Sequence, residues 1–245
     1  MLTLADRVRL EAKALEFRLP QDLLRAASAT ACRRLFRIAS PYRERDDELK
    51  AIFLHVPKAA GSSVRAAIFG GQSYHIPARR YFAGDPSRFD AYYKFTFVRN
   101  PWERLYSAYQ YLRAEHDASM AYPDHRWAAL YLRRLPTFAS FVDKLSDRRF
   151  LSQVRKYTHF RDQLDWLTLP GSDEPSADFI GRFENMAVDF SVVAKRLGIA
   201  AELPQLRVRN DATRIASAYT PRMTSIIGDI YVRDCRAFGY CSPDA

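Results

Sequence analysis

The stretch that decides the fold is Ala51-Ile-Phe-Leu-His-Val-Pro-Lys-Ala-Ala-Gly-Ser-Ser63. Its first six residues, 51–56, are almost wholly apolar, which is typical of a strand buried on both faces of a parallel sheet. Pro57 ends the strand and a turn follows. Residues 63–69 then have the spacing of a short helix that Gly70-Gly71 closes. The sequence therefore predicts a strand, a loop and a helix in direct succession.

The same succession recurs further along the chain. Residues 93–98 alternate aromatic and polar side chains, as in a strand. The next helix has a clear start, with Asn100 as N-cap, Pro101 at the first position and Glu103 at the third. A repeated strand-loop-helix order predicts an α/β fold with a mainly parallel central sheet flanked by helices.

Weaker patterns complete the predicted core. We expect a third strand over 178–183, a helix over 187–197 that ends at Gly198, and a last helix that starts at Thr220-Pro221. We expect loops over 118–125, 170–176 and 203–211. In parallel sheets ligands bind at the carboxyl ends of the strands, so the junctions after Val56 and Val98 are the expected site.

Residues 1–50 are predicted to be a helical N-terminal extension of a domain that spans 51–245. Apolar residues recur there at helical spacing, and Pro20 separates two helices. The extension holds 11 Lys/Arg and 8 Asp/Glu, a net charge of +3. We expect these helices to pack on the domain, with peripheral contact to an anionic membrane as the alternative.

Composition excludes several classes of protein. The chain has 245 residues, 48% of them hydrophobic, so it can bury a core and is not disordered. Its longest apolar run is too short to span a bilayer, and no secretory signal is visible. The three cysteines form neither a disulfide framework nor a zinc pattern. We expect a cytoplasmic protein, and the net charge of +10 favours anionic partners.

The first junction is suited to holding an anion. Gly61 lets the backbone approach a ligand closely, and the amides of residues 61–63 open a helix. Lys58 adds a full charge, while Ser62 and Ser63 add hydroxyl groups. The order differs from a Walker A loop, in which Lys directly follows Gly. An ordinary turn with an exposed lysine is the alternative.

The second junction, Phe97-Val-Arg-Asn-Pro-Trp-Glu-Arg-Leu-Tyr-Ser107, places a guanidinium at the ligand edge. Arg99 can grip a phosphate with two hydrogen bonds, and Ser107 lies two turns into the helix. Alternatively, Arg99 pairs with a neighbouring acid and Ser107 is a surface hydroxyl.

Together the two junctions resemble the sulfotransferases that use 3′-phosphoadenosine 5′-phosphosulfate (PAPS). The resemblance is to the carbohydrate branch that includes the heparan sulfate 2-O-sulfotransferases. It continues at Asp178-Phe-Ile-Gly-Arg-Phe-Glu184 and Phe238-Gly-Tyr240, so it covers roughly residues 50–240 in order. It implies a three-layer, P-loop-like fold with PAPS as the sulfonate donor.

The resemblance also implies roles for particular residues. Residues of the first junction would hold the 5′-phosphosulfate: Lys58, Ala60, Gly61, Ser62 and Ser63. Arg99 and Ser107 would bind the 3′-phosphate. Separately from the resemblance, Arg209 is expected to be a further cofactor contact, because it lies in a Pro-bounded loop before the last helix. The family often has Thr where Ala59 stands, and some members have an aromatic residue where Val64 stands.

The expected chemistry is in-line transfer of a sulfonate from PAPS to an acceptor hydroxyl. Lys58 and the helix amides would neutralise the leaving phosphate. His75 is the expected general base, because the family has a histidine in this interval. Glu115 or Asp85 is the alternative base, His55 is expected to be structural, and His116 and His125 flank a predicted lid. The reaction requires no metal.

The acceptor is expected to be a carbohydrate; a tyrosyl, phenolic or lipid hydroxyl remains an alternative. Basic residues that could line an acceptor cleft are Arg79, Arg80, Arg155, Lys156, Arg161, Arg207 and Arg209. The loop order argues against a nucleotide kinase. An alternative of another class is a basic, non-catalytic module that binds polyanions or membranes; we expect no nucleic-acid partner. The lack of a visible anchor suits a bacterial-type enzyme.

Overall fold

A computed structural model describes residues 40–71, 74–114, 123–200, 202–203 and 219–242. The described chain divides into two compact units. One, the sheet unit, contains residues 40–99 and 163–203, and the other, the helical unit, contains residues 100–162 and 219–242. The predicted helices before residue 40 lie outside the described residues. The predicted boundary after residue 50 stays a prediction.

The sheet unit is built on three parallel strands in the order β1-β2-β3. The strands are β1 (Ala51–Phe53), β2 (Tyr93–Val98) and β3 (Phe179–Arg182). The helices of this unit are α4 (Glu44–Leu49), α5 (Gly61–Ile68), α6 (Ala78–Gly84), α7 (Pro86–Ala91), α12 (Leu164–Leu167), η3 (Phe183–Asn185) and α13 (Met186–Leu197). In register, Phe53 faces Phe95 and Phe95 faces Phe179.

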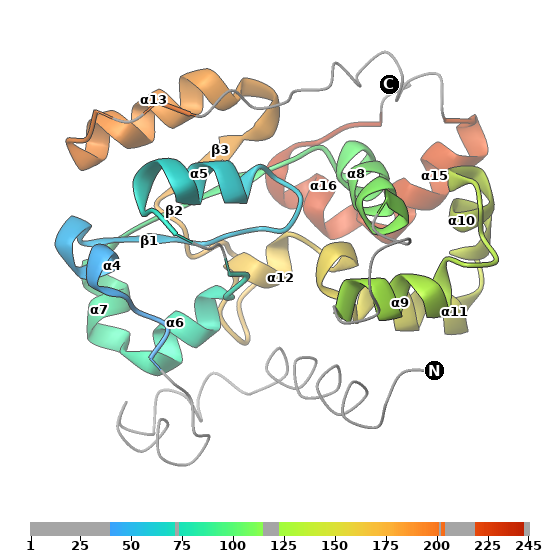
Figure 1. Cartoon of the computed structure of the whole chain (residues 1–245), viewed down its shortest axis with the longest axis horizontal. Coiled ribbons are helices and arrows are strands. Elements are labelled where there is room, and N and C mark those ends of the chain that lie inside the picture. Colours follow the sequence, from blue (N-terminus) through green and yellow to red (C-terminus); the bar gives the residue numbers. More distant parts are fainter. Residues whose placement is uncertain (1–39, 72–73, 115–122, 201, 204–218, 243–245) are drawn as a thin grey trace. The chain divides into compact units, whose positions relative to one another are not determined.

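Helices cover both faces of this sheet. In Figure 1, α5 and α13 lie on one side of the strands, and α6 and α7 lie on the other. Phe53 and Phe95 pack with Val64 of α5 and Phe190 of α13 in one buried cluster. The mixed α/β architecture with a parallel sheet flanked by helices confirms the predicted fold class.

The alternation over residues 93–98 suggested one polar face, but both faces of β2 are buried. Lys94 keeps its charge inside because its Nζ donates to the carbonyls of Phe89 and Tyr92 and pairs with Asp178. The Thr96 hydroxyl donates to the carbonyl of Leu54 at 2.6 Å. Both of these buried polar side chains therefore have partners within the sheet unit, which offsets the cost of burying them.

The predicted element bounds are close to the observed ones. The paired part of β1 ends at Phe53 rather than Val56, although the Leu54 amide still donates to the Phe95 carbonyl at 2.9 Å. The first helix begins two residues early, at Gly61. Gly198 ends α13 in the left-handed conformation, and Thr220 caps α15 through its side chain, both as predicted.

The helical unit consists of short helices around an aromatic core. They are α8 (Pro101–Ala114), α9 (Pro123–Tyr131), α10 (Phe138–Lys144), α11 (Arg148–Arg155), η2 (Thr158–Phe160), α15 (Pro221–Ile230) and α16 (Val232–Phe238). Asn100 caps α8 as predicted, with its side-chain oxygen accepting from the Trp102 amide at 3.0 Å. The predicted loop over 118–125 is wrong at its end, because Pro123 starts α9.

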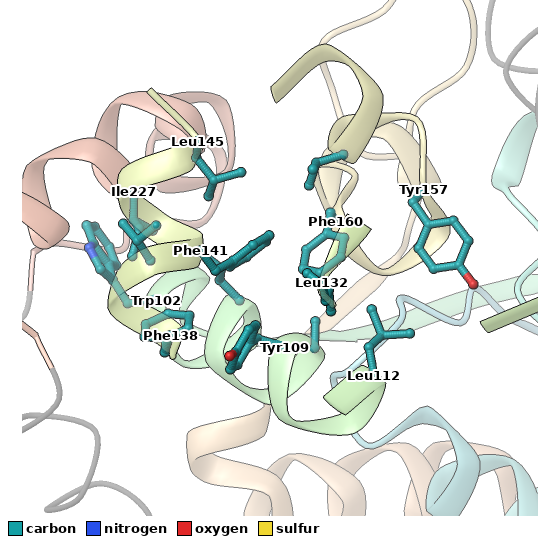
Figure 2. Packing of buried hydrophobic residues seen from close by; sticks show 14 of the residues in the cluster. Trp102, Tyr109, Leu112, Leu132, Phe138, Phe141, Leu145, Tyr157, Phe160 and Ile227 are labelled. Atoms are coloured by element: carbon teal, nitrogen blue, oxygen red, sulfur yellow. The ribbon is translucent and has the colours of Figure 1, made fainter. Parts of the chain in front are cut away.

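Aromatic rings from several helices fill this core, as Figure 2 shows. Phe141 of α10 packs between Tyr109 and Phe160, at ring-centroid distances of 5.3 and 5.4 Å. Trp127 stacks on Tyr157 at 4.4 Å. Such contacts bind α8, α9, α10 and η2 together mainly through burial of apolar surface.

Charged groups are also buried in the helical unit. The Arg104 guanidinium, 1% exposed, donates to the carbonyls of His159 and Arg161 and lies 3.9 Å from Asp234. Asp162 is fully buried and pairs with Arg155 and Arg233. Each charge has a counter-charge or carbonyl partners, which offsets its cost of desolvation.

Among the described residues, no helix is both long enough and apolar enough to cross a membrane.

Candidate functional site

The candidate site is at the carboxyl edge of the sheet unit. Three residues leave the three strands there: His55 follows β1, Arg99 follows β2 and Phe183 follows β3. Because the strands are parallel, all three ends meet at one edge of the sheet. The first junction of the sequence therefore lies beside the second, as predicted.

The loop from Lys58 to Ala60 has an unusual backbone. Lys58 has φ 69° and Ala60 has φ 60°, the left-handed region that non-glycine residues rarely adopt. Each such residue costs about 1–2 kcal/mol. Ala60 uses this conformation to start α5, with the amides of Ser63 and Val64 donating to its carbonyl. Strained residues at a strand end are frequent at ligand sites.

Gly61 is required because the ring of His55 lies directly against it. A Cβ on Gly61 would lie 1.7 Å from His55 Cδ2, so no other residue fits without moving the ring. His55 is buried and stacks on Phe53, with ring centroids 5.5 Å apart. This packing fits the prediction that His55 has a structural role. The lack of a side chain at Gly61 lets the His55 ring pack against the backbone, in addition to the predicted close approach of a ligand.

The start of α5 offers donors to an anion. The amides of Gly61 and Ser62 have no hydrogen-bond partner among the described residues. Ser62 is exposed, and Ser63 and Lys58 are half-buried. Amides in the first turn carry the positive end of the helix dipole, so this turn favours a negatively charged group.

His75 lies next to this loop. Its ring centroid is 4.2 Å from that of His55 and 5.9 Å from that of Trp166 in α12. His55 in turn touches Gly61, so the expected base and the expected phosphosulfate loop are joined through one buried ring. Their roles as base and donor loop stay predictions. Trp166, which lies beside His75, was not singled out from the sequence.

Arg99 is held by groups that the sequence did not reveal. The buried Gln163 side chain accepts from the Arg99 amide and donates to its carbonyl, both at 2.8 Å. The guanidinium lies over the ring of Phe183, 4.1 Å from its centroid. The backbone of Arg99 is therefore fixed by Gln163, and its guanidinium is stacked on an aromatic ring at the end of β2. Gln163 lies 64 residues from Arg99 in sequence, so only the fold brings them together.

Of the other predicted site residues, one lies in the helical unit, four lie outside the described residues and one caps a helix of the sheet unit. Ser107 is half-buried on α8 of the helical unit. Arg207, Arg209, Glu115 and His116 lie outside the described residues. The alternative base Asp85 caps α7, accepts from the Arg88 amide at 3.1 Å and pairs with the Arg88 guanidinium.

Several basic residues expected at an acceptor cleft have structural partners. The buried Arg79 donates to the carbonyl of Asp165 at 3.2 Å. Arg161 donates to the carbonyl of Lys156 at 2.9 Å, and Arg155 pairs with buried Asp162. In each of these three arginines, guanidinium N–H groups that a sugar would require as donors are engaged by other residues and stabilise the fold.

The two remaining described histidines are both in the helical unit. His125 is buried on α9. His159 Nε2 lies 3.3 Å from Asp124, whose carboxylate also accepts from the hydroxyls of Tyr157 and Tyr111. Burial alone would raise the pKa of Asp124, but these hydrogen bonds and the charge of His159 hold it below its usual value.

No group of three or more His, Cys, Asp or Glu side chains in the described ranges could hold a metal ion. A pocket of about 400 Å³ in the helical unit contains none of the predicted site residues. Its lining includes Trp102, Thr224, Gly228, Asp229 and Tyr240.

Comparisons with known proteins identify the family of this chain. The model of the "Sulfotransferase family" matches residues 44–241. The chain is 27% identical over 121 residues to an "Uncharacterized protein" of Archaeoglobus fulgidus, across 47% of this chain and 75% of that protein. No solved structure matches. Because the family match spans most of the sequence, the chain is an enzyme of the sulfotransferase family, whose P-loop-like fold its parallel sheet fits.

Proposed function

We propose that the protein transfers a sulfonate group from PAPS to a carbohydrate hydroxyl, with His75 as general base. The observation that carries the proposal is the contact chain from His75 through His55 to Gly61. This chain puts an imidazole beside a strained, donor-rich loop at the edge of the sheet. A sulfotransferase needs a base and an anion-binding loop at one place.

The donor loop fits a phosphosulfate. The amides of Gly61 and Ser62, the hydroxyl of Ser63 and the charge of Lys58 give it donors and a positive potential. PAPS, when bound, supplies an activated sulfonate with 3′,5′-ADP as the leaving group. Lys58 and the amides would stabilise the negative charge that grows on the leaving phosphate oxygen.

Proton transfer falls to His75. As the acceptor oxygen forms its bond to sulfur, the bond from sulfur to the phosphate oxygen breaks. A ring nitrogen of His75 takes the hydroxyl proton, so the charges balance with an imidazolium and a stabilised leaving group. His55 and Trp166 hold the His75 ring between them, which limits its rotation.

Arg99 would bind the 3′-phosphate. Its stacking on Phe183 and the Gln163 clamp fix the guanidinium at the end of β2. Bidentate contact with phosphate distinguishes a 3′,5′-bisphosphate from 5′-AMP. Ser107 and Arg209 remain proposed additional contacts. The carbohydrate acceptor rests on the resemblance of the two junctions and on the basic composition.

The test is transfer of radiolabelled sulfonate from PAPS to a panel of neutral and acidic oligosaccharides, a tyrosyl peptide, a phenol and a lipid alcohol. We expect labelled carbohydrate, and a loss of about 10²–10⁴-fold in turnover for His75→Ala. Lys58→Ala should abolish transfer as well. Lys195→Ala, at an exposed position on α13, is the matched control and should stay fully active. Near-normal turnover of the His75 variant would show that another group is the base.

A further inference from the structure

Four exposed arginines form a surface on the helical unit. Arg133 and Arg134 follow the last turn of α9, and Arg148 and Arg149 begin α11. We refer to these four residues as the arginine surface. None of the four guanidinium groups has a hydrogen bond or ion pair among the described residues, although the Arg149 backbone amide donates to the capping carboxylate of Asp147.

The two arginine pairs belong to neighbouring elements. Tyr131, the last residue of α9, contacts Phe150 of α11, with ring centroids 6.3 Å apart. One pair begins two residues after Tyr131, and the other lies directly before Phe150. The two rings also pack against the same aromatic core, and Figure 1 shows α9 and α11 adjacent. Four positive charges are therefore concentrated where these helices meet.

Local acids do not neutralise this charge. Residues 123–156 contain eight Lys/Arg and three Asp/Glu, so half of the net charge of +10 comes from this segment. Asp124 is held by His159 and two tyrosines. Asp143 pairs with Arg222 at 3.4 Å, and Asp147 pairs with Lys144 at 2.8 Å and caps α11. All three acids are engaged elsewhere.

An apolar side chain accompanies the arginines. Leu130 is 46% exposed on α9, one turn before Arg133 and Arg134. Unpaired arginines attract any polyanion, but an extended polyanion makes no use of an exposed leucine. A bilayer with acidic headgroups accommodates both, because Leu enters the acyl boundary while Arg binds phosphates.

We propose that the arginine surface, with Leu130, docks the protein on an anionic lipid bilayer. The surface lies outside residues 1–50, where the sequence suggested membrane contact. Each basic residue near an acidic membrane strengthens partitioning about fivefold, so four together produce a measurable affinity. The inference is independent of the sulfonate transfer proposed above, since it concerns residues of the helical unit and needs no PAPS.

The test is co-sedimentation of the full chain with phosphatidylcholine vesicles that contain, or lack, about a third phosphatidylglycerol. We expect binding only with phosphatidylglycerol, weakened by salt. Arg133→Glu/Arg134→Glu and Arg148→Glu/Arg149→Glu should each weaken it at least about 25-fold. The charge-matched control is Lys195→Glu/Arg196→Glu on the exposed part of α13, which should retain most of the binding.

Leu130→Ser separates a bilayer from a soluble polyanion. It should weaken vesicle binding about tenfold and leave binding to dextran sulfate unchanged. Equal vesicle binding by wild type and both arginine variants would overturn the proposal and assign membrane contact to other residues. Tight binding to dextran sulfate without binding to vesicles would also overturn it. Circular dichroism of each variant checks that the fold persists.

Discussion

The sheet unit and the helical unit use polar groups in opposite ways. At the edge of the sheet, Lys58 and Ser62 are at least partly exposed, and the loop stores strain at Lys58 and Ala60. In the helical unit, Arg104 and Asp162 are buried, Arg104 against backbone carbonyls and Asp162 against two arginines. The difference teaches where chemistry can occur: polar groups at the strand ends reach the surface beside a strained loop, whereas the buried charges among the helices stabilise the fold.

A core truncation in the helical unit should have the largest effect on stability. Phe141 is fully buried between Tyr109 and Phe160, so Phe141→Ala should cost about 3–5 kcal/mol in the free energy of unfolding. Urea denaturation followed by tryptophan fluorescence measures this cost. Ala139→Gly, at an exposed position on the same helix, is a control for propensity and should cost about 1 kcal/mol. Equal costs for the two variants would contradict the packing described.

A smaller change in the sheet unit should affect ligand binding as well as stability. Gly61→Ala places a methyl group where the His55 ring lies, so we expect a loss of about 1–3 kcal/mol in stability. Binding of the sulfonate donor PAPS should weaken too, because the displaced His55 ring also packs against His75.

The double variant Gly61→Ala/His55→Ala tests whether the clash with the ring is the cause. Its cost should be less than the sum of the two single costs, since the ring is gone. If the costs of the two single substitutions simply added in a double-mutant cycle, contact with the His55 ring would not be the reason for a glycine at position 61.

The last expected effect depends on pH and concerns Asp124 of the helical unit. Because the folded-state pKa of Asp124 is lowered, its contribution to stability is complete above the usual carboxyl pKa of about 4. That contribution is lost as the pH falls through the lowered folded-state value. The stability advantage of wild type over Asp124→Asn, roughly 1–3 kcal/mol at neutral pH, should therefore shrink below about pH 4. If the stability advantage of wild type over Asp124→Asn did not change with pH, the Asp124 carboxylate would not be stabilised in its ionised form as described.

Sequence reasoning succeeded where the signal is local. The run before Pro57, the N-cap at Asn100 and the glycine that ends α13 are each fixed by neighbouring residues, and each was confirmed. The roles of the loop residues and of His75 rest on a family pattern within a short stretch of sequence, and they stay predictions. The length of β1 was overestimated because residues can be apolar and buried without being paired.

Contacts between distant segments could not be predicted. Gln163 supports Arg99 across 64 residues, and Asp162 pairs with Arg233 across 71. Ala60 in the left-handed region contradicts its local preference and is explained only by the packing of the loop. Both faces of β2 are buried because helices cover them, which no alternation within the strand reveals.

The central claim is that the loop from Lys58 to Ser63 holds the donor nucleotide. Isothermal titration of 3′,5′-ADP, with 5′-AMP and ATP–Mg²⁺ as comparisons, tests it on the wild type, Lys58→Ala, Arg99→Ala and Lys195→Ala. The account predicts preferential binding of 3′,5′-ADP by the wild type and the Lys195 variant, and a loss of about tenfold or more for the other two. Preference for ATP–Mg²⁺, or unchanged binding by the Lys58 variant, would contradict it.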